Sequence, residues 1–161
     1  NNCRIENNLI NGVNLRDSTL HVSDSRIIGN RKGLYLQRSK VTVENNLLAD
    51  NSEHGLYLED SAGVVRGNRI GGNGRAGIRT LGFTGEIVGN ALAGNGVYAL
   101  QNDGRTTVAA HGNWWGTVDR EDISALIRDG GDRPGTGAVT VGVPLHGEPS
   151  GLPIINGRIS R

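Results

Sequence analysis

The sequence predicts a single all-β domain, folded as a parallel β-solenoid of about 22 residues per coil. Three observations lead there. A phrase ending in asparagine recurs along the chain, apolar residues alternate within each repeat, and glycine fills 26 of the 161 positions, against a usual share of about 7%. Alternation is the period of a strand, and Gly, Asn, Asp and Ser bound each short run as bends do. Helical repeats are disfavoured because the repeats lack the i, i+3, i+4 apolar spacing of a helix.

The repeat is anchored by apolar residues at positions 22, 43, 65, 87 and 110. Three positions after the last four of them stands a column of asparagines: Asn46, Asn68, Asn90 and Asn113. A side-chain amide can donate and accept at once, so we interpret this column as a structural ladder. Two further columns hold Asn30, Asn51, Asn73 and Asn95, and the inward residues Ile27, Leu48, Ile70, Leu92 and Trp115. In the first coil Asn8 precedes Ser25 by 17 positions, which predicts a shortened turn.

The repeated pattern N-x-I-x-x-N-x-x-x-G-L-x-L resembles the right-handed parallel β-helix repeat of pectate-lyase-like proteins, over about residues 5–116. The phrase GNWWGT at residues 112–117 resembles the ending of many bacterial secreted β-helices. The resemblance implies a right-handed solenoid and an extracellular or cell-surface location. We therefore expect coils over residues 1–116, which would continue a longer solenoid whose upstream portion belongs to the same polypeptide.

The period stops after residue 116, and residues 117–144 are expected to form a C-terminal cap. Its first part, residues 119–129, predicts a short helix, because an aspartate can cap its start and apolar residues follow at i, i+3 and i+4. Residues 138–143 alternate like a strand. The end of a solenoid exposes apolar interior and unpaired strand edges, which such a cap would cover. Residues 145–161 are expected to be an irregular tail or linker.

An outward row of side chains is the strongest candidate for a binding site. Leu34 and Leu36 are expected to point inward, so Tyr35 points outward. Coils stack at about 4.8 Å, which places the equivalent residues of successive coils side by side. The candidate ligand-binding residues are Tyr35, Tyr57, Arg79, Gln37, Glu59 and Arg38. Aromatic faces stack on sugar rings and planar polar groups bond hydroxyls or carboxylates, so this row suits a polysaccharide or cell-surface glycan. The alternative is that the row only reinforces the sheet.

The signals for catalysis are weaker. Enzymes of the family that the chain resembles use acidic residues, often with calcium, and a basic residue that removes a proton. Glu59, Asp60 and Arg79 are the candidates of those types. Glu59 and Asp60 are adjacent and should face opposite ways unless a bend intervenes, which makes them a poor pair for glycoside hydrolysis. Calcium is expected only if the chain is a lyase, and no other metal or cofactor is expected.

Composition and motif context disfavour other classes. With 17 basic and 16 acidic side chains, the chain does not require a nucleic-acid partner. No apolar run approaches the ~18 residues of a membrane span, so membrane insertion is not expected. The G-x-G-x-x-G at residues 72–77 precedes a strand pattern, whereas a dinucleotide site needs a helix there. The four histidines, at 21, 54, 111 and 146, have no metal-ligand spacing and are expected at the surface or an edge.

Three functions remain open. The first is a non-catalytic, secreted or surface β-helix segment that binds glycan or serves as a spacer. The second is the C-terminal part of a polysaccharide lyase, glycoside hydrolase or epimerase that acts on an acidic polysaccharide. The third is a trimeric phage-tail component. The outward row favours the first.

Overall fold

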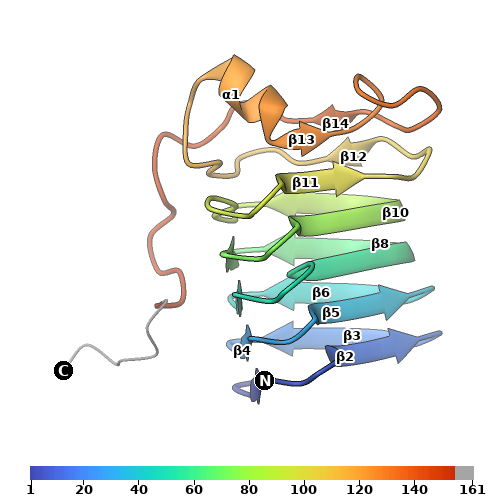
Figure 1. Ribbon diagram of the computed structural model, residues 1–161, viewed down its shortest axis with the longest axis vertical. Coiled ribbons are helices and arrows are strands. Elements are labelled where there is room, and N and C mark those ends of the chain that lie inside the picture. The colour runs from blue at the N-terminus through green and yellow to red at the C-terminus, as the bar shows by residue number, and fades with distance from the viewer. Residues whose placement is uncertain (155–161) are drawn as a thin grey trace.

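The computed structural model describes residues 1–154, and their strands form a stack of coils with parallel pairing between neighbouring coils (Figure 1). The predicted fold class, a parallel β-solenoid with about five turns of 22 residues, is confirmed. Each regular coil makes three short straight runs, so the stack has three faces. Parallel strands stacked in this way satisfy one another's backbone groups from coil to coil.

We number the faces by the strands that build them. Face 1 contains β2 (Asn11–Arg16), β5 (Lys32–Gln37), the first part of β8 (Leu56–Arg66) and of β10 (Ala76–Val88), β11 (Tyr98–Asn102) and β13 (Ile127–Arg128). Face 2 contains β3 (Thr19–Ser23), β6 (Lys40–Glu44), the second parts of β8 and β10, β12 (Val108–Ala109) and β14 (Val139–Thr140). Face 3 contains β1 (Arg4–Glu6), β4 (Arg26–Ile28), β7 (Leu47–Ala49) and β9 (Arg69–Gly71). Strands β8 and β10 turn the corner between faces 1 and 2 without a break.

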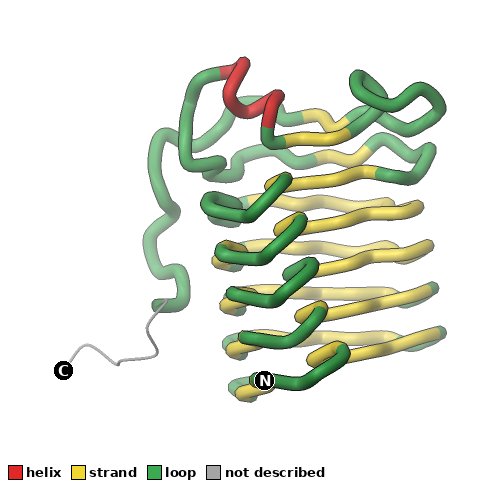
Figure 2. The backbone as a smooth tube through the Cα atoms, viewed as in Figure 1, coloured by secondary structure: helices red, strands yellow, loops and turns green. Residues whose placement is uncertain are grey.

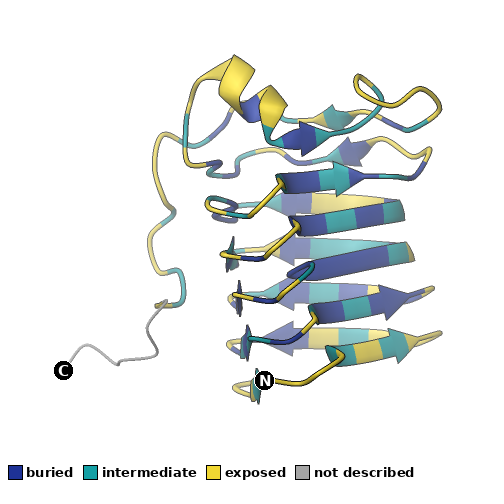
Figure 3. Cartoon of the chain, in the orientation of Figure 1, coloured by how far each residue is buried: buried dark blue, intermediate teal, exposed yellow. Residues whose placement is uncertain are grey.

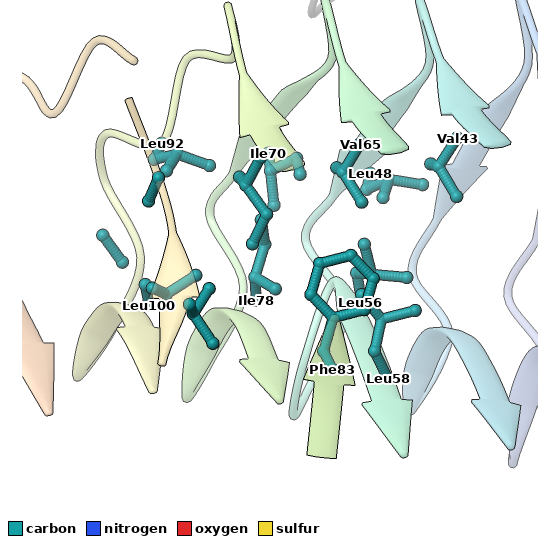
Figure 4. Packing of buried hydrophobic residues seen from close by; sticks show 14 of the residues in the cluster. Val43, Leu48, Leu56, Leu58, Val65, Ile70, Ile78, Phe83, Leu92 and Leu100 are labelled. Atoms are coloured by element: carbon teal, nitrogen blue, oxygen red, sulfur yellow. The ribbon is translucent and has the colours of Figure 1, made fainter. Parts of the chain in front are cut away.

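The core fills the space between the three faces, as the alternation predicts. The inward column Ile27, Leu48, Ile70, Leu92 and Trp115 is at most 1% exposed. From face 1, leucines and isoleucines such as Leu56, Leu58 and Ile78 meet it, with Phe83 alongside (Figure 4). Figure 3 shows this burial along the strands of the middle coils, while exposed residues gather at the cap and the loops. One coil could not bury these side chains alone, so stacking provides the stability.

The asparagine columns are hydrogen-bonded ladders, which confirms their structural interpretation. Asn68 Oδ1 accepts from the backbone N–H of Asn46 at 2.9 Å, and Asn68 Nδ2 donates to Asn90 Oδ1 at 2.9 Å. The prediction for the first coil was wrong. Asn8 donates to Asn30 Oδ1, one 22-residue step away, while Ser25 accepts from the N–H of Cys3. The first coil is therefore regular, because Asn8 belongs to the second asparagine column.

A serine ladder that the sequence analysis missed lies at the corner between faces 1 and 2. The N–H of Ser18 donates to Ser39 Oγ, and the N–H of Ser39 donates to Ser61 Oγ. The hydroxyl of each serine then donates to the backbone carbonyl of the residue two positions before it. The 21- and 22-residue spacing of these serines was the available signal.

The corner between faces 1 and 2 also explains one glycine. Asp60 turns there with φ of 46° and Gly82, its equivalent in the next coil, with φ of 79°. A Cβ on Gly82 would lie 2.6 Å from Asp60 Oδ1, so no larger residue fits without a shift. Glycine adopts a positive φ without the steric penalty of a side chain.

The chain after the last coil covers one end of the stack (Figure 1). Helix α1 spans Arg120–Ala125, and the Asp119 carboxylate caps it by accepting from two backbone N–H groups. The helix is shorter than predicted, because Ile127–Arg128 pair with β11 as strand β13 instead of continuing the helix. The predicted strand over residues 138–143 is limited to Val139–Thr140. The domain boundaries at 116 and 144 stay predictions.

The segment from residue 145 to 154 has no helix or strand and runs back alongside face 3 (Figure 2). Arg69 holds it by an ion pair with Glu148 and by a bond to the carbonyl of Pro153. The Nη1 of Arg26 donates to the carbonyl of Ile154 at 2.8 Å. Residues 155–161, the rest of the predicted tail, lie outside the described part of the chain.

Candidate functional site

The register of face 1 confirms the expected outward column. Tyr35 pairs with Tyr57, Tyr57 with Arg79, and Arg79 with Gln101, each one coil apart. The column begins at Asn14 and ends at Arg128 of β13. We call these six residues the face 1 row: Asn14, Tyr35, Tyr57, Arg79, Gln101 and Arg128.

The aromatic part of the row is packed more tightly than the sequence analysis expected. The rings of Tyr35 and Tyr57 meet edge to face, with centroids 4.8 Å apart. The Arg79 guanidinium lies 4.6 Å from the centroid of the Tyr57 ring, in cation–π geometry. Tyr57 points away from the core but is only 7% exposed. Both tyrosines thus lie in the expected outward column, but Tyr35 is half-buried and Tyr57 is covered by its neighbours.

Glu59 lies beside the tyrosines and is held by two donors. Its Oε2 accepts from the Tyr35 hydroxyl at 2.7 Å and from Gln37 Nε2 at 3.0 Å. The Tyr35 bond lowers the pKa of Glu59, while burial and then the Glu59 carboxylate raise the pKa of Tyr35 to about 12. Near neutral pH this pair is a carboxylate with a neutral phenol. Glu59 is suited to accept hydrogen bonds and poorly suited to act as a general acid.

The other end of the row is rich in arginine. Arg79 Nε lies 2.7 Å from Asp103 Oδ2, and Gln101 donates to the same oxygen. Arg133, from the loop after β13, lies 3.7 Å from the other oxygen of Asp103. The side chain of Asp103 is 7% exposed, that of Arg79 31% and that of Arg133 57%. One buried carboxylate thus bonds Arg79 and lies within ion-pair distance of Arg133, and both arginine side chains are partly exposed.

Sequence reasoning missed Asp103, Arg128 and Arg133. Asp103 stands two 22-residue steps after Glu59, so the period could have placed it in the same column. Arg128 and Arg133 belong to the cap, where the period no longer applies. Their positions become visible only when β13 pairs with β11 and extends face 1 by one coil.

Arg38 and Asp60 lie at the corner between faces 1 and 2 and not in the row. Arg38 makes two bonds to the carboxylate of Asp17, at 2.7 and 2.8 Å, and these bonds lower the pKa of Asp17. Asp60 is exposed and, with Arg38 and Lys40, lines an open groove of about 840 Å³. The bend at Asp60 turns this carboxylate toward the groove, whereas Glu59 bonds over face 1. The three catalytic candidates are therefore divided between two surfaces.

His54 is buried, whereas the sequence predicts a surface or edge position for all four histidines. It is only 3% exposed, whereas His21, His111 and His146 are exposed. Its Nδ1 accepts from the backbone N–H of Ala76, and its ring centroid lies 5.8 Å from that of Tyr57. The corner before β8 thus carries a buried imidazole directly beside the face 1 row.

Metal ligation has no evident site in residues 1–154: no group of three or more His, Cys, Asp or Glu side chains there could hold an ion. The glycine-rich segment at residues 72–77 is a bend that leads into β10, as interpreted. The helix in the described part of the chain is too short to cross a membrane.

Comparison with protein families gives a match over residues 1–113 to the model described as "right handed beta helix region". The chain belongs to this right-handed β-helix family. The match fixes the handedness that the resemblance implied and covers the coils that carry the face 1 row from Asn14 to Gln101. No curated protein and no solved structure matches the chain significantly. The right-handed β-helix therefore provides the scaffold, and any function must be argued from the side chains on it.

Proposed function

We propose that this right-handed β-helix is a non-catalytic module that binds an acidic polysaccharide along face 1, outside the cell or at its surface. The observation that carries the proposal is the face 1 row itself, in which aromatic, amide and guanidinium groups stand on successive coils. An extended ligand lying along the stack would meet one such group per coil, about every 4.8 Å.

The arrangement of the row supports a ligand that carries both hydroxyls and carboxylates. The half-buried ring of Tyr35 and the ionised Glu59 offer an apolar contact and an acceptor for hydroxyls. At the other end Arg79, Arg128 and Arg133 outnumber Asp103, so the spare donors favour an anionic group. Arginine binds carboxylates with two parallel hydrogen bonds, which selects acidic over neutral sugars.

The same contacts favour binding over catalysis. The carboxylate of Glu59 accepts from Tyr35 and Gln37, and Asp103 is paired with Arg79. Arg79 is itself occupied by Asp103 and by the Tyr57 ring, which argues against its acting as a proton-removing base. Asp60 is turned toward the corner groove. The side chains of the row are already held by hydrogen bonds and ring contacts, which limits the side-chain conformational entropy lost on binding.

The test is binding of the purified chain to oligouronates and to neutral oligosaccharides, measured by calorimetry. Tyr35→Ala removes the half-buried ring and leaves the buried Tyr57 in place. Thr42→Ala, on β6 of face 2, is the matched control because Thr42 also points outward at a central coil. We expect oligouronate binding to weaken at least tenfold in Tyr35→Ala and to be unchanged in Thr42→Ala.

Three results would count against the proposal. Absence of binding to every sugar would favour a spacer. Equal binding by Tyr35→Ala and the parent would show that the binding site does not include Tyr35. Cleavage of the oligouronate would also be tested, with and without calcium. If the chain cleaves it and Glu59→Gln or Arg79→Gln does not, the protein is a lyase or hydrolase and not a binding module.

A further inference from the structure

We propose that His54 makes the face 1 row acid-sensitive: its protonation releases Tyr57 and Arg79 from the stack that presents them. The consequence for ligand binding rests on the proposed function. The release itself is a property of the protein alone and can be measured without a ligand.

His54 is built into the structure as a neutral side chain. It is 3% exposed, and its Nδ1 serves as an acceptor for the backbone N–H of Ala76, at 3.3 Å. That N–H lies at the first residue of β10, the strand that also carries Arg79. The imidazole therefore helps to fix the start of β10, and it needs the lone pair of Nδ1 to do so.

Protonation would remove this contact and add a charge. A protonated Nδ1 carries a hydrogen, so it cannot accept from Ala76, and the two N–H groups would face each other. The ring also packs against Tyr57, on whose face the Arg79 guanidinium lies. Movement of His54 toward water would leave Tyr57 without its neighbour and would loosen the Tyr57–Arg79 stack.

The charged groups around His54 come from each element packed against it. Lys32 of β5 and Arg79 of β10 are cations, and Glu53, the residue before His54, is an anion bonded to Lys32 and Arg31. Tyr57 of β8 adds a neutral phenol. Burial first, and then the charge of Arg79, lowers the pKa of His54 to about 4, against the opposing charge of Glu53. The switch is therefore expected in the acidic range, below the pH at which an exposed histidine titrates.

The experiment is an NMR titration of the whole chain from pH 7 to pH 3, following histidine and tyrosine ring signals. His54→Asn is the test variant because its side-chain oxygen can still accept from Ala76 but does not titrate. It also identifies the His54 signal by its disappearance. Glu59→Gln is the control for carboxylate titration near Tyr35.

We expect the Tyr57 signals to shift with the same midpoint as His54, near pH 4, in the parent and in Glu59→Gln, and not in His54→Asn. Identical tyrosine shifts in the parent and in His54→Asn would overturn the proposal. If His54→Asn does not fold, the titration of the parent still tests the proposal. Different midpoints for the His54 and Tyr57 signals would overturn it.

Binding of an oligouronate at pH 7 and one pH unit below the midpoint separates the two proposals. The parent should lose about tenfold more affinity than His54→Asn, because only about a tenth of the parent then keeps a neutral His54. Equal losses would refute the link between the switch and the ligand. Tyrosine release without binding at any pH would leave the switch standing and refute the proposed function.

Discussion

Asn68 lies in the middle of the first asparagine ladder, and its replacement by alanine should destabilise the protein more than its size suggests. The side chain makes four bonds: it accepts from the N–H and Nδ2 of Asn46 and donates to the carbonyl of Val43 and to Asn90 Oδ1. Asn46, Asn68 and Asn90 are all 0% exposed. Removing the amide therefore leaves polar groups buried without their partner.

The magnitude follows from those groups. At least two of them, the N–H of Asn46 and the carbonyl of Val43, lose a bond where water has no direct access. Each buried unsatisfied group costs about 1–3 kcal/mol, so we expect a loss of about 2–6 kcal/mol. A domain of this kind is stable by about 5–15 kcal/mol, so the loss is a large part of the total. A water molecule in the vacated space would move the result toward the lower limit.

The assay is urea unfolding followed by circular dichroism, with Asn14→Ala as the matched control. Asn14 is exposed at the end of the face 1 row, and its replacement should change stability by less than about 0.5 kcal/mol. Equal unfolding midpoints for Asn68→Ala and Asn14→Ala would refute the reasoning that the ladder bonds stabilise the coils.

Asn68→Asp sharpens the test because it keeps the shape and reverses one polarity. A carboxylate oxygen would replace the amide that donates to Val43 and Asn90, so acceptor would face acceptor. Burial should raise the pKa of this carboxyl in the folded state above its unfolded value of about 3.9. The protonated form is then favoured by folding, so the deficit should shrink as the pH falls and grow as it rises. A deficit that is the same at pH 7 and pH 4 would contradict this.

Other predictions concern the core, a corner and an ion pair. Leu58→Ala should cost about 2–5 kcal/mol as a core truncation, and an unchanged urea midpoint would contradict the register. Gly63→Ala should destabilise severely or prevent folding, because φ is 145° and a Cβ would meet the carbonyl of Val41, whereas Gly147→Ala has open space and should be nearly neutral in thermal unfolding. Burial alone would raise the pKa of Glu53, but bonds from Lys32 and Arg31 lower it to about 2. The stabilisation from this group is thus present above about pH 4.5 and lost as the pH falls toward 2. In Glu53→Gln the free energy of unfolding should therefore fall less steeply over this pH range. An unchanged pH dependence would be evidence against the ion pair.

The sequence was sufficient for whatever the 22-residue period controls. The ladders of Asn46 and Asn68, the inward position of Trp115 and the order of Tyr35, Tyr57 and Arg79 all follow from adding one coil at a time. The error at Asn8 arose from comparing it with Ser25 and not with Asn30, although the latter step was the regular one.

The burial of Tyr57 and His54 could not be read from the period. Alternation places Tyr57 on the outer side of a strand, and it does lie there, but its exposure depends on how Arg79 folds back over the ring. Likewise, His54 is covered by neighbours from adjacent coils, and rotamers decide that contact. The length of α1 also depended on tertiary structure, because pairing of Ile127 with Leu100 ends the helix early.

Ring contacts between coils distinguish the face 1 row from the outer surface of face 2, where ion pairs of Glu44 with His21 and Arg66 link three coils. On face 2 the outward column that begins at His21 and Thr42 continues to Val64, Glu86 and Ala109, residues with little common chemistry. On face 1 the tyrosines touch each other, Tyr57 touches Arg79, and Arg79 bonds Asp103. If these side chains only reinforced the sheet, separate cross-strand pairs would be enough, each contributing about 0.2–1 kcal/mol to stability. A continuous chain of contacts also fixes the direction of each side chain, as a binding surface requires. Because the row passes from aromatic to cationic along the stack, it has a polarity, and a ligand that reads it should bind in one orientation.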